Sequence, residues 1–168
     1  MTAPNHLTAA DAVAQLGTGA LTAEALTRAC LDRAEERRDV KAWIWLDPEA
    51  ALAQARAADH AGRPGLLTGL PIGVKDIIDT FDMPTGHGSP IYRGNRPFTD
   101  AACIALLRMS GATIMGKTVT TEFANRFPGA TVNPHNRRTR PAARRVARPP
   151  RSPISRCRPR SGPRPAAR

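Results

Sequence analysis

The chain has 168 residues, 41% of them hydrophobic and 4% aromatic, and a formal net charge of +11. Residues 1–136 hold 13 Lys and Arg against 14 Asp and Glu, whereas residues 137–168 hold 12 Arg, 7 Pro and no acid. Three widely spaced cysteines without a C-x-x-C pair argue against a disulfide framework and a zinc site. No stretch nears the 18 apolar residues of a membrane span. Asp11 interrupts the only early apolar stretch, so we expect no signal peptide and a cytoplasmic chain.

The first 61 residues alternate helical patterns with one short apolar strand. A helix is expected over residues 8–16, and a second opens at Thr22, a residue type favoured at helix N-termini. A strand over residues 42–46 precedes Asp47-Pro48, a typical helix start, and an alanine-rich helix over residues 50–61 follows.

The following residues are expected to form a strand, a loop, a helix, a buried strand and a helical turn (residues 70–80, 84–97, 101–110, 113–115 and 121–125). Asp100 is placed to cap the helix and Gly111 to end it. Phe123 and Phe127 are expected in the core. Helices that alternate with short apolar strands predict an α/β fold.

Lys75 lies in the apolar run PIGVKDII, so the strand around it is expected to be buried. A lysine in such a run either reaches water from a strand end or is desolvated. Desolvation lowers the pKa of the amine and makes its neutral form a usable base. Asp76 and Asp79 would meet on a helix but not on a strand. We therefore expect Asp76 to orient the loop or the lysine rather than to act as an acid.

Residues 111–118, GATIMGKT, match the G-x-x-x-x-G-K-T pattern of a phosphate-binding loop. That loop needs a strand before its first glycine and a helix that starts at the lysine. Here a helix is expected before Gly111 and an apolar strand after it, which disfavours nucleotide binding. Gly116-Lys117-Thr118 is instead expected to be a tight turn after a core strand.

The remaining polar candidates give weaker signals. The four histidines lack the spacing of metal ligands, so no metal is expected. Gly86-His87-Gly88-Ser89 is either the lining of a substrate cleft or a plain turn.

Three segments together resemble the amidase signature family: GLPIGVKD at 69–76, GKTVTTEFA at 116–124 and NPHN at 133–136. The resemblance extends over essentially all of residues 1–136. It implies that these residues are the incomplete N-terminal part of a mixed-sheet α/β fold. It also implies hydrolysis or transfer of small-molecule amides by a Ser–cis-Ser–Lys triad without a cofactor, with Lys75 as the triad lysine.

The two serine segments of that family, P-G-G-S-S-S-G-S and T-G-G-S, are absent from the sequence. The loss of one base after the Asn136 codon would account for this absence. Given codon degeneracy, the codons of residues 137–151, read in the shifted frame, can encode PAHTPGGSSSGSAAA, and those of residues 160–168 can encode ALGTQTGGS. We therefore expect an out-of-frame tail over residues 137–168, disordered because it buries too little apolar surface. The chain would then be a truncated, inactive amidase. The alternative is a nucleic-acid-binding protein that contacts phosphates through this tail.

Overall fold

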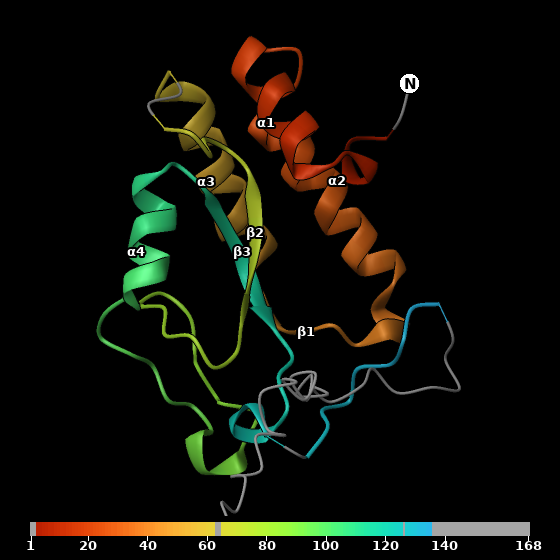
Figure 1. The fold of residues 1–168 in the computed structure, drawn as a ribbon, viewed down its shortest axis with the longest axis vertical. Helices are drawn as coiled ribbons and strands as arrows, with labels where there is room; N and C mark the ends of the chain where they lie inside the picture. Colours follow the sequence, from red (N-terminus) through yellow and green to blue (C-terminus); the bar gives the residue numbers. More distant parts are fainter. Residues whose placement is uncertain (1–2, 63–64, 126, 136–168) are drawn as a thin grey trace, which may run out of the picture.

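A computed structural model describes residues 3–62, 65–125 and 127–135, and Figure 1 shows their arrangement. The helices are α1 (Ala9–Thr18), α2 (Ala23–Glu36), α3 (Pro48–His60) and α4 (Ala102–Met109), and the strands are β1 (Trp43–Leu46), β2 (Pro71–Lys75) and β3 (Thr113–Thr118). Short 3-10 turns lie at η1 (Pro4–His6), η2 (Arg38–Val40), η3 (Pro90–Tyr92) and η4 (Glu122–Ala124). The predicted α/β class is confirmed. The expected arginine-rich tail lies outside the described residues.

The three strands form one mixed sheet with β3 in the middle, in the order β1-β3-β2. β3 runs parallel to β2 and antiparallel to β1. Val74 of β2 lies opposite Lys117, and Lys75 lies opposite Thr118. The tight turn expected at Gly116-Lys117-Thr118 is therefore wrong, because β3 continues through these residues and pairs with both neighbours.

Helices cover the two faces of the sheet, as Figure 1 shows. On one face, Ile104 of α4 packs in a buried cluster with Val74 and Ile114. On the other face, Met115 packs with residues of α2 and α3 in a second cluster. Ile114 and Met115 are adjacent in β3 and therefore point to opposite faces of the sheet, which places them in different clusters.

The helix starts expected from sequence are confirmed by their caps. The side chains of Thr8, Thr22 and Asp47 each accept a hydrogen bond from the backbone N–H three residues further along. Gly19 ends α1 in the left-handed conformation, with φ of 78°, and Gly111 follows α4 with φ of 86°.

Two expectations about the second half are wrong. Asp100 does not cap α4, whose N-cap residue is Ala101; its carboxylate accepts from the Phe81 N–H at 3.0 Å and from Arg108 Nε at 2.9 Å. Phe123 and Phe127 are 47% and 70% exposed, so neither belongs to the core.

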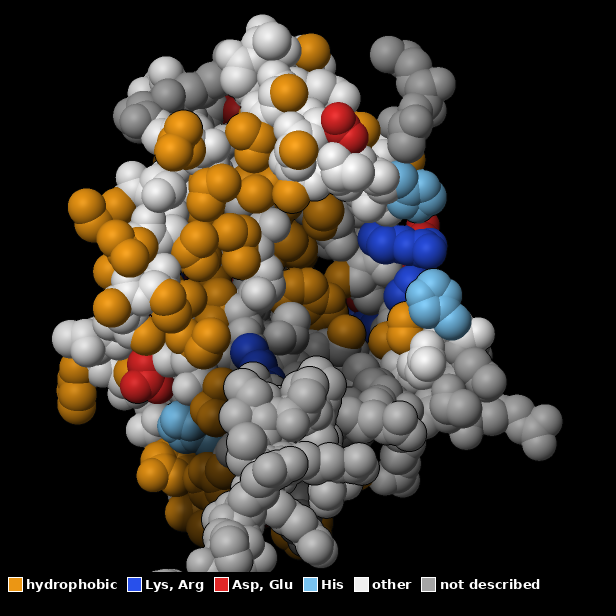
Figure 2. Space-filling model, in the orientation of Figure 1, with side chains coloured by type: hydrophobic (Ala, Val, Ile, Leu, Met, Phe, Trp, Pro, Cys, Tyr) orange, Lys and Arg blue, Asp and Glu red, His pale blue; other side chains and the backbone are white. Residues whose placement is uncertain are grey.

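Large apolar side chains remain exposed around α4. Leu106 and Met109 on the helix and Leu66 and Phe98 in nearby loops are all more than 60% exposed. Figure 2 shows hydrophobic side chains gathered on the side of the molecule where α4 lies. Within the described part of the chain, no helix is both long and apolar enough to cross a bilayer.

Candidate functional site

The loop that follows β2 wraps around the side chain of Asp76. This carboxylate is 2% exposed; Oδ1 accepts from the Gly86 N–H at 2.9 Å and Oδ2 from the Gly88 N–H at 3.4 Å. Backbone donors on both oxygens offset the cost of burying the charge. Asp76 therefore orients the loop, as the sequence predicted.

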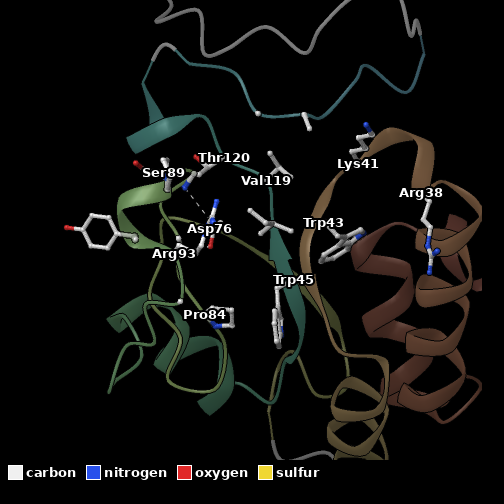
Figure 3. Close-up of a pocket in the computed structure, with 18 residues that line it drawn as sticks. Arg38, Lys41, Trp43, Trp45, Asp76, Pro84, Ser89, Arg93, Val119 and Thr120 are labelled. Carbon is white, nitrogen blue, oxygen red and sulfur yellow. Dashed lines mark hydrogen bonds between the residues drawn. The ribbon is translucent and has the colours of Figure 1, made fainter.

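A cavity of about 720 Å³ opens beside this loop. Its lining includes Trp43 and Trp45 of β1, Asp76 and the glycines of the Gly86–Ser89 segment. Figure 3 shows Asp76 and Ser89 on one side of the cavity and Trp43 on the other. The Ser89 N–H also donates to the Gly86 carbonyl at 2.9 Å. The Gly86–Ser89 segment is thus a turn and a cavity wall at the same time.

The turn η4 supports this wall from outside. Ser89 Oγ donates to Glu122 Oε1 at 2.7 Å, and the Phe123 N–H donates to the His87 carbonyl at 2.9 Å. His87 and Phe123 have φ of 53° and 47°, a left-handed conformation that costs a side-chain-bearing residue about 1 kcal/mol or more. The sequence does not predict the role of Glu122, because nothing local connects it to Ser89.

Lys75, the expected catalytic residue, ends β2 next to Asp76. Its side chain is exposed, so among the described residues it follows the first of the two alternatives, a lysine that reaches water from a strand end. Among those residues, no hydrogen bond or ion pair is formed by its ammonium group. Lys75 is also not part of the cavity lining.

The buried lysine is Lys117, with 0% exposure. Its ammonium donates to the Ile78 carbonyl and to Thr85 Oγ1, both at 2.6 Å. Desolvation lowers the pKa of Lys117, and the negative charges of Asp76, Asp79, Asp82 and Asp100 oppose that shift without cancelling it. The sequence pattern suggests a role for this lysine only as part of a phosphate loop. The strand–loop–helix arrangement that such a loop needs is not formed, because α4 precedes Gly111 and β3 follows it.

The described residues contain two serines, and neither contacts a lysine. Ser89 bonds to Glu122, and Ser110 Oγ donates to the Leu106 carbonyl at 2.9 Å. No group of three His, Cys, Asp or Glu side chains able to hold a metal ion occurs in the same part of the chain.

The amidase family model matches residues 25–143. The chain belongs to the amidase family. It is 44% identical over 129 residues to a subunit of the glutamyl-tRNA(Gln) amidotransferase of Chloroflexus aggregans, an alignment that covers 74% of this chain and 26% of that protein. It is 45% identical over 113 residues to the putative amidase AmiD of Mycobacterium bovis, with 64% and 24% covered.

Solved structures agree with this membership. The peptide amidase from Stenotrophomonas maltophilia superimposes with a TM-score of 0.67 at 35% identity, over 74% of this chain and 27% of that one. A fatty acid amide hydrolase superimposes with a TM-score of 0.73 at 24% identity, over 80% and 26%, which is evidence for the fold alone. The chain spans about a quarter of the length of the curated relatives it matches.

Proposed function

We propose that residues 1–136 supply the lysine-bearing part of an active site that cleaves or transfers a carboxamide C–N bond. The observation that carries this proposal is the amidase match over residues 25–143, which includes the GVKD segment. The cavity beside Asp76 supports it, because it offers space for a small-molecule amide next to the residue that follows Lys75.

In the proposed chemistry, the neutral amine of Lys75 accepts a proton through a bridging serine. A second serine attacks the amide carbonyl, and backbone N–H groups stabilise the tetrahedral oxyanion. The oxyanion collapses as the C–N bond breaks, and the nitrogen leaves as ammonia or an amine after it takes up the proton. Water then hydrolyses the acyl-enzyme ester, which releases the acid and restores the serine hydroxyl. No metal or cofactor takes part in these steps. A neutral lysine amine requires burial or a neighbouring cation. Lys75 is exposed among the described residues, so the proposed site requires other residues to cover this side chain.

The chain as written is proposed to be inactive. Neither glycine–serine segment of the family occurs in its sequence, so the two serines that the proposed chemistry requires beside Lys75 are missing. We attribute this to a lost base after the Asn136 codon, which makes residues 137–168 an out-of-frame tail. Resequencing the coding region tests this step directly: one additional base near codon 137 restores P-G-G-S-S-S-G-S, and an unchanged sequence contradicts it.

The activity is tested by comparing the chain as written with the frame-restored protein on simple carboxamides, with ammonia release as the readout. We expect turnover only from the restored protein, and its loss in Lys75→Ala. Arg28→Ala is the matched control, because it removes an exposed cation from α2. Amide hydrolysis by the chain as written that disappears on Lys75→Ala would overturn the proposed inactivity.

The tail suggests a second function, non-specific binding of nucleic acid. Twelve arginines in residues 137–168 meet no acidic residue, whereas residues 1–136 hold almost balanced charges. Binding driven by counterion release is independent of sequence and falls steeply with salt. Comparing the full chain with Arg→Gln replacements throughout the tail on unrelated duplexes tests this. Unchanged binding, or a strong preference for one duplex, contradicts it.

A further inference from the structure

The ammonium group of Lys117 has no part in the proposed amide chemistry. It projects from the central strand β3, is 0% exposed, and donates to the Ile78 carbonyl and to the Thr85 hydroxyl at 2.6 Å. Both acceptors are uncharged, and both belong to the loop that leads from β2 to the cavity wall. Burial of a charged amine is costly unless hydrogen bonds and nearby charge offset it.

Two ordinary roles for a buried lysine do not fit Lys117. No carboxylate among the described residues lies within ion-pair distance of its Nζ. The side chain also has no exposed surface through which a substrate or a phosphate could reach it. The hydrogen bonds of its ammonium group are therefore with the loop that contains Ile78 and Thr85.

The charges around Lys117 support this arrangement from a distance. Asp76, Asp79, Asp82 and Asp100 all favour its charged form. Arg108 forms ion pairs with Asp82 at 2.7 Å and with Asp100 at 2.9 Å. Asp76 thus contributes to the field at Lys117 while its own oxygens accept the Gly86 and Gly88 N–H groups.

Lys117 and Asp76 consequently hold one loop at adjacent points. Lys117 binds Thr85, and Asp76 binds Gly86, the next residue. Asn95 completes the attachment, because its side-chain amide donates to the Thr85 carbonyl and its own carbonyl accepts from the Thr85 N–H, both at 3.0 Å.

We infer that Lys117 is a positioning residue for the cavity: it fastens the loop 78–88 to β3 and so keeps the Gly86–Ser89 wall against Asp76. This role is independent of amide turnover, since it concerns the geometry of the wall in the chain as written. Loss of the ammonium group would free the wall while leaving the helices on the other face of the sheet in place.

Amide hydrogen exchange of the full chain tests the inference. We expect Lys117→Met and Thr85→Val to accelerate exchange at Gly86 and Gly88 by about tenfold or more, because a hydrogen bond to a charged group is lost. Amides within α3 should keep their rates. Thr27→Val is the matched control, since this threonine is 0% exposed but its hydroxyl has no hydrogen-bond partner among the described residues.

A second readout separates positioning from general support of the fold. In Thr85→Val the ammonium group loses an acceptor of its charged form, so the pKa of Lys117, followed by the carbon resonance of its ε-methylene group, should fall further. It should not change in Thr27→Val. Equal acceleration of exchange at all amides, unaltered exchange at Gly86 and Gly88, or an unaltered Lys117 titration would each overturn the inference. Thr85→Val decides alone if Lys117→Met does not fold.

Discussion

Two carboxylates perform the same task in two different regions of this molecule. In the helical layer, Asp59 of α3 accepts the N–H groups of Ala23 and Glu24 at 2.8 Å and 3.0 Å, at the start of α2. In the cavity region, Asp76 accepts the N–H groups of Gly86 and Gly88. Asp59 is half-buried, whereas Asp76 is 2% exposed.

The surroundings of the two carboxylates explain why the regions differ in robustness. The α2 start is also capped by Thr22 and held by apolar packing between α1, α2 and α3, so Asp59 is one support among several. The cavity wall also has apolar contacts, since the ring of His87 packs against Tyr92 and Phe123, but in the described residues its glycines and Ser89 are held by polar contacts that involve Asp76, Lys117 and Glu122. We expect polar substitutions to be mild in the first region and severe in the second.

The largest contrast is expected between Asp76→Ala and Asp59→Ala. Removing the buried Asp76 leaves the Gly86 and Gly88 N–H groups without their acceptor and withdraws a charge that favours the buried ammonium of Lys117, which together should cost about 3 kcal/mol of unfolding free energy. Removing Asp59 should cost about 1 kcal/mol, as for loss of a helix cap. Urea denaturation of both variants measures the difference. Equal losses would show that the wall does not depend on Asp76.

Glycine substitutions sharpen the same comparison. Gly88 has φ of +66°, and a Cβ there would lie 3.0–3.1 Å from atoms of Thr120 and Thr121. Gly88→Ala should therefore destabilise the chain by about 1–2 kcal/mol. Gly17, in α1, would place a Cβ with no atom within 4 Å, so Gly17→Ala should stabilise by about 0.5–1 kcal/mol. Thermal melts of both variants check the opposite signs.

The helical layer was predictable because its signals are local. Thr8, Thr22 and Asp47 cap helices through bonds that span three residues, and the sequence pattern contains both partners. Asp100 shows where this approach fails. Its position suits a cap, but Arg108 and the Phe81 N–H compete successfully for its carboxylate.

The cavity region was predictable only in part. The sequence predicts the loop-orienting role of Asp76, but it leaves the burial of Lys75 open and does not predict that Lys117 is buried. Lys75 and Lys117 both follow apolar residues, GV and IMG, so composition does not distinguish them. Their burial depends on strand order: β3 lies between two strands and under the loop, whereas β2 is at the edge of the described sheet.

The smallest expected effect is a pH dependence specific to Lys117. Its folded pKa lies below its ordinary value of 10.5, because desolvation outweighs the nearby aspartates. Between those two pKa values the unfolded chain binds more protons at this group than the folded chain does. The unfolding free energy contributed by Lys117 therefore rises with pH across that interval and is constant below it. Urea denaturation from neutral to alkaline pH should show this rise in the unmodified chain relative to Lys117→Met. Lys75→Met is the control: the side chain of Lys75 is exposed, so this substitution should leave the rise in place. A rise that survives in Lys117→Met would assign it to another titratable group.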